Sequence, residues 1–195
     1  MRRAGWLLVA PALFAGCLLR NASAPPRFFA PGSAAAAEET DEREVAGGTG
    51  FPIQLRAVHG TAFLRERIVW RISPVEYGQY EERLWCELPA TYVKRALAAE
   101  LRRAPGLRLT DDVRAPALRV EVLAFDEVLA PTHAATVSLA VSLRDGGGDQ
   151  LLDRTFTAGA PIAGDDPAMM AEAMGRALGE ATTAVVTAVA AAVRR

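Results

Sequence analysis

The chain is poor in the residues that usually carry enzyme chemistry. It contains only two histidines, His59 and His133, and two cysteines, Cys17 and Cys86, among its 195 residues. No HExxH or CxxC spacing of the kind that holds zinc is present. The sequence also lacks the GxSxG turn that would present a nucleophilic serine. We therefore predict no catalytic residue, no metal site and no cofactor, and we expect that the protein is not an enzyme.

Acidic pairs do occur, but each falls where the chain is expected to turn or to begin a helix. The pairs are Asp111-Asp112, Asp126-Glu127 and Asp165-Asp166. At such positions solvated or capping roles are more common than acid–base catalysis. An enzyme is kept only as a third hypothesis, which activity dependent on His133 or Asp126 would revive.

Neither sign of charge predominates, and no apolar run is long enough to span a bilayer. Lys and Arg number 22 and Asp and Glu number 23, giving a net charge of −1. This balance argues against nucleic-acid binding. The apolar stretch at residues 4–15 falls short of the roughly 20 residues that a membrane-spanning helix needs. We interpret it as part of a signal that is removed.

The first residues have the layout of an export signal. Arg2 and Arg3 precede the apolar stretch, which ends in Phe14-Ala15-Gly16-Cys17. This tetrapeptide resembles a bacterial lipobox, although leucine is usual where Phe14 stands. We predict that residues 1–16 are a lipoprotein signal peptide and that Cys17 is the lipid-attachment site, carrying palmitate or similar acyl groups. The alternative is an ordinary signal peptide. Leu18, where sorted lipoproteins retained at the inner membrane carry Asp, favours the periplasmic side of the outer membrane.

Residues 17–50 are expected to form a lipidated N-terminus and a largely flexible tether, because Ala, Pro, Gly and Glu dominate them. Residues 25–29, Pro-Pro-Arg-Phe-Phe, are the exception, since adjacent aromatic rings favour a packed position. We expect either a short strand against the domain or a contact for a partner. If Cys17 carries lipid, Cys86 has no partner for an internal disulfide, and we predict that Cys86 is a small buried thiol.

Residues 51–195 are predicted to form a single α+β domain. Its sheet should be antiparallel or mixed, with about five or six strands, and two helices should pack on it, the longer one C-terminal. Alternation of apolar and polar residues predicts strands at 51–57, 68–72, 118–122, 137–143 and 151–157. The turn at 145–149, Asp-Gly-Gly-Gly-Asp, joins the last two as a hairpin.

Helix signals flank both expected helices. Pro89 suits a first helical turn, and Val93, Leu97 and Leu101 recur every four residues until Pro105-Gly106. The segment from Asp165-Asp166-Pro167 onward begins with a cap and a proline and keeps helical apolar spacing to the end of the chain. Its Ala-rich end is expected to pack on the core, with oligomer contact as the alternative.

The densest aromatic stretch runs from Trp70 to Trp85 and includes Tyr77 and Tyr80, mixed with arginines and glutamates. These rings could form the seam between the sheet and the first helix. They could also form a docking surface for a partner protein or an acyl chain, because Trp, Tyr and Arg are favoured interface anchors.

Several of these features together resemble a known family. They are the lipobox, the Pro-Pro-Arg-Phe-Phe segment, the run Leu-Arg-Glu-Arg-Ile-Val-Trp-Arg at 64–71, Tyr-Gly-Gln-Tyr at 77–80, and Trp85 four residues before Pro89. In this combination the chain resembles the ABC-type transport auxiliary lipoproteins of the paraquat-inducible protein C kind, which accompany MCE-domain lipid transporters. The resemblance covers nearly all of the chain after the signal peptide.

The resemblance implies a periplasmic α+β domain with no catalysis of its own, which supports movement of lipids or other hydrophobic molecules across the envelope. Its implied partners are an MCE-domain protein and its ABC transporter, the membrane through the lipid anchor, and possible further copies of the chain. Arg71, Tyr77, Tyr80 and Trp85 match the family pattern and are our predicted partner-binding residues. The alternative function is that of a lipoprotein regulator of a cell-wall synthase.

Overall fold

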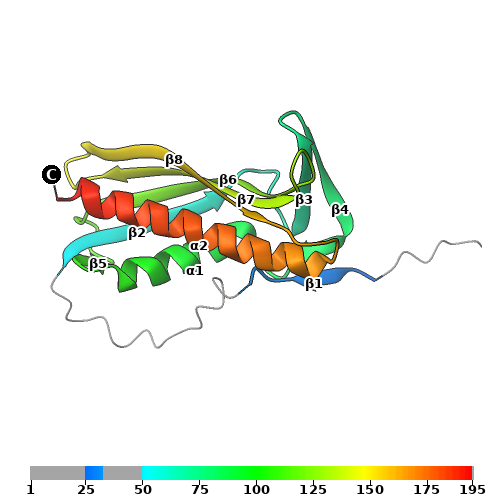
Figure 1. Ribbon diagram of the computed structural model, residues 1–195. Coiled ribbons are helices and arrows are strands. Elements are labelled where there is room, and N and C mark those ends of the chain that lie inside the picture. Colours follow the sequence, from blue (N-terminus) through cyan, green and yellow to red (C-terminus); the bar gives the residue numbers. More distant parts are fainter. Residues whose placement is uncertain (1–24, 33–49, 195) are drawn as a thin grey trace, which may run out of the picture.

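The computed structural model describes residues 25–32 and 50–194 (Figure 1). The predicted signal peptide, and Cys17 with residues 18–24 and 33–49 of the expected tether, lie outside the described residues. The elements, in chain order, are β1 (Arg27–Phe29), β2 (Phe51–Gly60), β3 (Arg67–Ser73), β4 (Glu76–Trp85), α1 (Pro89–Arg103), β5 (Leu107–Leu109), β6 (Ala117–Val128), β7 (Ala134–Arg144), β8 (Gln150–Pro161) and α2 (Pro167–Ala192). The fold is therefore α+β with the longer helix last, as predicted.

Strand β6 is the centre of a mixed eight-stranded sheet. Along one edge it pairs in parallel first with β2 and then, at its end, with β3. Along its other edge it pairs antiparallel with β7, which continues into β8 through the predicted hairpin. Outward from β3 come β4 and β1, and outward from β2 comes β5. Because two strands share one edge of β6, the β3–β4 hairpin projects beyond the end of β2 (Figure 1).

The helices cover one face of the sheet (Figure 1). Helix α2 packs on β7 and β8, while α1 packs on α2, β2, β5 and β6. Asp166 caps α2 by accepting a hydrogen bond from the Ala168 backbone N–H at 3.0 Å, and Pro167 occupies the first turn. Val185, Val186 and Val189 are buried, so the Ala-rich end of α2 packs on the core. No helix among the described residues combines the length and apolarity that a membrane crossing requires.

The N-terminal segment 25–32 contributes a strand to the sheet. Of the two alternatives for residues 25–29, a short strand against the domain is therefore the one that the structure has. β1 pairs in parallel with β4, placing Phe29 opposite Trp85. After the strand, the Gly32 N–H donates to the carbonyl of Ala171 in α2 at 2.9 Å. The segment passes very close to α2 at Gly175, since a Cβ on Gly175 would lie 2.6 Å from the Gly32 nitrogen. A glycine is required there because any side chain would push the segment off the helix.

Two sequence predictions about local structure were wrong. The sheet has eight strands, not five or six, because β4 carries few alternating aliphatic residues and β5 is only three residues long. Cys86 is exposed and not buried. Neighbouring residues of an extended chain point to opposite sides, so burial of Trp85 turns Cys86 outward. The backbone N–H of Cys86 donates to the carbonyl of Phe29 at 2.8 Å.

Candidate functional site

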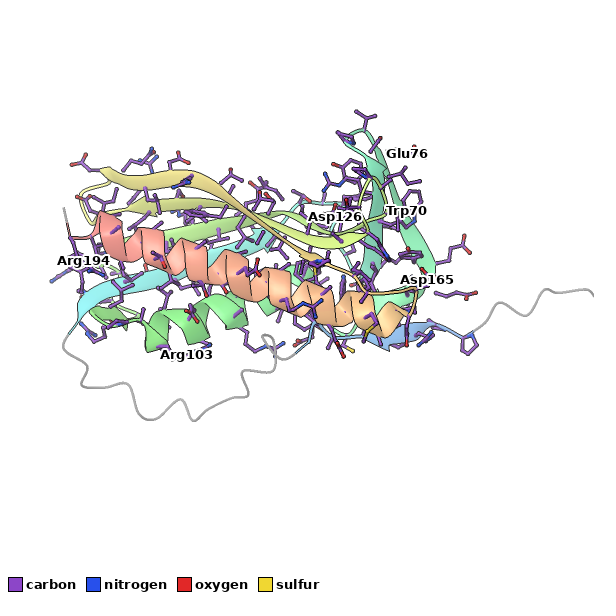
Figure 2. The ribbon with its side chains drawn as sticks, viewed as in Figure 1. Trp70, Glu76, Arg103, Asp126, Asp165 and Arg194 are labelled. Atoms are coloured by element: carbon purple, nitrogen blue, oxygen red, sulfur yellow. The ribbon has the colours of Figure 1, made fainter. Side chains whose placement is uncertain are left out.

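The base of the β3–β4 hairpin contains two buried acidic residues. Asp126 is 1% exposed and Glu127 is 4% exposed. The prediction that this pair is solvated or capping was therefore wrong. The physical reason is that β6 continues to Val128, where β3 flanks it on one side and β7 on the other. Figure 2 shows Asp126 near Trp70 at this base, with Glu76 close to the hairpin tip.

On one face of the sheet, Asp126 pairs with Arg71 of β3. The Arg71 Nε lies 2.9 Å from Asp126 Oδ2. The contact is poorly directed as a hydrogen bond, because neither carboxylate oxygen of Asp126 has a hydrogen-bond partner among the described residues. Burial raises the pKa of Asp126 above its usual value, and the Arg71 charge opposes this rise without cancelling it. Burying the ionised carboxylate of Asp126 therefore costs desolvation free energy, and the nearby charge of Arg71 offsets part of that cost.

Arg71 also contacts the first tyrosine of the aromatic stretch. Tyr77 lies opposite Arg71 in the β3–β4 register. The guanidinium carbon is 5.8 Å from the centroid of the Tyr77 ring, within the range of a cation–π contact. One arginine therefore connects a buried carboxylate of β6 to a tyrosine that is 48% exposed on the hairpin.

Glu127 points to the opposite face and has its own set of partners. His133 Nε2 lies 2.7 Å from Glu127 Oε1, and Arg83 Nη1 lies 3.8 Å from Glu127 Oε2. The Arg83 guanidinium carbon lies 4.1 Å from the Tyr80 ring centroid. Burial raises the pKa of Tyr80 to about 12, helped by the charge of Glu127 and its hydrogen bond with the phenol and opposed by Arg83. At neutral pH Tyr80 is therefore a neutral donor beside this carboxylate.

Trp70 and Gly78 form a cross-strand pair in the same hairpin. The indole of Trp70 lies over Gly78 so closely that a Cβ at this position would overlap the ring. Covering a strand glycine with an aromatic ring compensates for the packing that glycine cannot supply. Gly78 is thus needed for close approach and not for a turn.

Beyond the buried base, the hairpin exposes apolar side chains. Val75 in the turn is 90% exposed, and Ile72 is 41% exposed. Leu129, 37% exposed, is joined to β3 by a hydrogen bond from its backbone N–H to the Arg71 carbonyl at 2.8 Å. Together with Tyr77 these residues form what we call the hairpin tip. Apolar residues exposed at the end of a projecting element are candidates for a contact with a partner.

Trp85 does not belong to this surface. It is 1% exposed, and its ring packs edge-on against Phe125 at 5.3 Å and Tyr92 at 6.3 Å between ring centroids. Trp85 therefore forms the seam between the sheet and α1, and no partner can reach it in this structure. Pro89 begins α1 next to this seam.

Arg71, Tyr77, Tyr80 and Trp85 thus all lie on the β3–β4 hairpin, but Trp85, at the end of β4, is buried in the core. The residues that the sequence analysis missed are the buried acids and their partners Arg83 and His133. One signal was available: the apolar run Val-Leu-Ala-Phe at 122–125 directly continues the strand predicted at 118–122 up to Asp126. Because Asp126 and Glu127 point to opposite faces, they cannot act together on one substrate. What the arrangement does chemically is join three strands by charge and hold the hairpin in one position.

The family of the chain follows from its sequence profile. The chain belongs to the ABC-type transport auxiliary lipoprotein component family, whose profile matches residues 34–186. Membership indicates an auxiliary role in ABC-type transport and an envelope-associated, lipid-anchored protein. No curated protein gives a significant match.

Solved structures share this fold. A crystal structure of a Xanthomonas campestris protein has 20% identity and a TM-score of 0.70, covering 86% of this chain and 97% of that chain. An uncharacterized protein has 16% identity and a TM-score of 0.62, covering 73% of this chain and 94% of that one. A hypothetical protein from Chlamydia trachomatis has 11% identity and a TM-score of 0.51, covering 75% and 98% respectively. At such identities the likeness shows the fold alone.

Proposed function

We propose that the chain is a lipid-anchored periplasmic auxiliary subunit of an MCE-type ABC transport system, which moves lipids or other hydrophobic molecules across the envelope. Membership in the auxiliary lipoprotein family supports the transport role. The observation that carries the docking mechanism is an exposed apolar tip on a hairpin whose base is held by buried charges. The protein contributes binding and position, and the transporter contributes the energy.

A rigid hairpin suits a docking role. Arg71 joins β3 to Asp126 of β6, and Glu127 joins β6 to Arg83 of β4, so the hairpin cannot pivot without separating buried charges. A surface that is already held in its binding conformation loses less conformational freedom on association. Tyr77 and Val75 then present apolar area with little reorganisation, as interface anchors do.

Lipid attachment at Cys17 would keep this hairpin near a membrane. Seven residues lie between Cys17 and Pro25, the first described residue, so eight Cα–Cα steps join the two. At about 3.5 Å per residue they reach at most about 28 Å. We propose the periplasmic side of the outer membrane, because Leu18 follows the cysteine. The hairpin tip would then meet a partner that approaches the same membrane.

Site-specific photocrosslinking tests the proposal. A photoreactive residue replaces Tyr77 in the full chain, and Leu151, 36% exposed on β8, is replaced in the matched control. We expect an MCE-domain protein to be captured from position 77 and not from position 151. Capture of a peptidoglycan synthase would instead favour regulation of cell-wall synthesis, and capture of a second copy alone would show that the tip forms an oligomer contact. Equal capture at both positions would contradict docking through the tip.

A further inference from the structure

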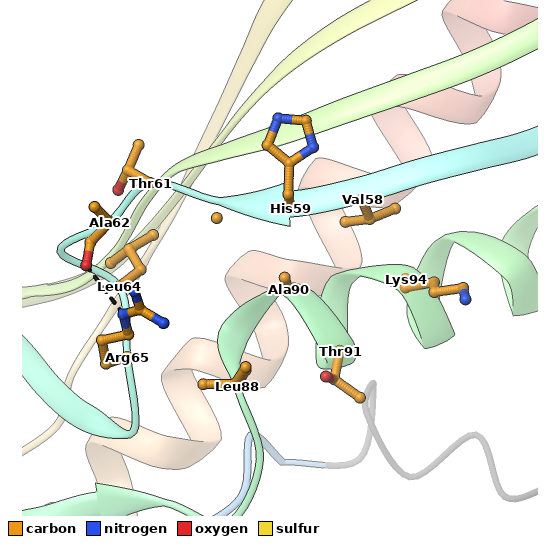
Figure 3. Close-up of a pocket in the computed structure, with 11 residues that line it drawn as sticks. Val58, His59, Thr61, Ala62, Leu64, Arg65, Leu88, Ala90, Thr91 and Lys94 are labelled. Atoms are coloured by element: carbon orange, nitrogen blue, oxygen red, sulfur yellow. Dashed lines mark hydrogen bonds between the residues drawn. The ribbon is translucent and has the colours of Figure 1, made fainter.

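A cavity of about 450 Å³ opens between the end of β2, the loop that follows it and the first turns of α1 (Figure 3). Its volume is within the range of small-ligand sites, about 300 to 1,000 Å³. Val58 of β2, Leu64 of the loop and Leu88 at the start of α1 supply aliphatic surface. Leu88 is 39% exposed. This wall offers contact to a hydrocarbon chain.

The rest of the lining combines basic residues with small and hydroxyl residues. His59, Arg65 and Lys94 line the cavity, and none of its lining residues is acidic. Arg65 Nε donates to the carbonyl of Ala62 at 3.2 Å, a bond drawn in Figure 3, which holds the guanidinium beside the opening. Within the described part of the chain, none of the three basic side chains forms an ion pair. The charges of Arg65 and Lys94 are therefore available to an anion from outside.

We infer that this cavity binds a single-chain amphipathic anion, such as a fatty acid or an alkyl phosphate. The head group contacts the basic residues and the first carbons of the chain lie on the aliphatic wall. An inorganic anion would leave the aliphatic wall in contact with water, and an alkyl cation would face the like charges of Arg65 and Lys94, so the lining matches neither. The inference gives this chain a ligand of its own, which the docking role does not require.

Titrations with matched amphiphiles test the inference. Backbone amide shifts are followed in the full chain carrying Cys17→Ser, which lacks the thiol that is predicted to be lipidated. Decanoate and decyl phosphate should both shift the amides of residues 58–65 and 88–94 in a saturable way, and their relative affinities distinguish a carboxylate from a phosphate head. Decyltrimethylammonium and inorganic phosphate should bind at least about tenfold more weakly. The first lacks the anionic head group, and the second lacks the hydrocarbon chain.

Charge reversal on α1 supplies the matched variants. Lys94→Glu should lower the affinity for decanoate by about tenfold or more. Arg102→Glu, also exposed on α1 but away from the cavity lining, should change it less than about twofold. Both sites are on the surface, and unchanged amide spectra outside the cavity verify folding. Equal binding of the cationic amphiphile, shifts that avoid the cavity, or equal effects of the two variants would each overturn the inference.

Discussion

Replacing Arg71 by methionine should isolate the energetics of the hairpin base. The change keeps most of the side-chain volume but leaves the Asp126 carboxylate, 2% exposed, without its cation. Breaking a buried ion pair from one side costs about 3 to 5 kcal/mol, because an uncompensated charge remains. Arg71 itself is 25% exposed, so part of its interaction is screened by water, and we expect a loss of about 3 kcal/mol.

The pH dependence identifies the carboxylate as the cause. The pKa of Asp126 is raised in the folded chain, so the native state binds this proton more readily than the unfolded state. Such a group adds stability at low pH and loses it as pH rises through the folded pKa. Removing Arg71 raises that pKa further. The loss caused by Arg71→Met should therefore be smaller at pH 5 than at pH 7.5.

Urea unfolding followed by tryptophan fluorescence measures these changes, since Trp85 is buried against Phe125. Adding Asp126→Asn to Arg71→Met should recover at least about 1.5 kcal/mol, because the unpaired charge is gone. Wild type and Asp126→Asn complete the double-mutant cycle. Equal losses at both pH values together with additive single effects would refute the reasoning.

Three further changes test other parts of the fold. Gly78→Ala should destabilise by about 1 to 3 kcal/mol by displacing Trp70, and the loss should shrink in a Trp70→Ala background. Gly175→Ala should release segment 25–32 from α2 and speed hydrogen exchange at Phe29, whereas Gly159→Ala, where a Cβ has ordinary contacts, should not. The pKa of Tyr80 is raised to about 12, so its phenol adds stability that is lost as pH rises from 10 to 12. Tyr80→Phe should therefore reduce the fall in the free energy of unfolding between pH 10 and pH 12, as measured by urea unfolding at each pH.

Much of the fold could be predicted because its local signals agree with its packing. Strands β6, β7 and β8 alternate apolar and polar residues, as expected for a sheet with one face covered by helices. Both helices begin at a proline in the first turn. The predicted turn at 145–149 joins β7 to β8 as an antiparallel pair, whose register shifts once, between Leu143 and Arg144.

The candidate site was harder to predict because it depends on contacts between distant strands. Asp126 and Glu127 read as a turn in isolation, and they are buried only because β3 reaches the end of β6 from more than 50 positions earlier in the chain. Strand β4 carries Arg83, whose partner Glu127 lies on β6. Conversely, Trp85 matched an interface anchor by residue type, yet its position opposite Phe29 in the sheet buries it.

A pair of valine substitutions tests docking through the hairpin tip most directly. Val75 is 90% exposed at the tip, and Val113 is 78% exposed in the loop before β6, so neither change to Asp disturbs the core. Full chains with each change are purified from the envelope, and the MCE-domain protein and ABC transporter that accompany them are quantified. We predict that Val75→Asp lowers their recovery at least about tenfold while Val113→Asp leaves it unchanged. Undiminished recovery with Val75→Asp would contradict the account.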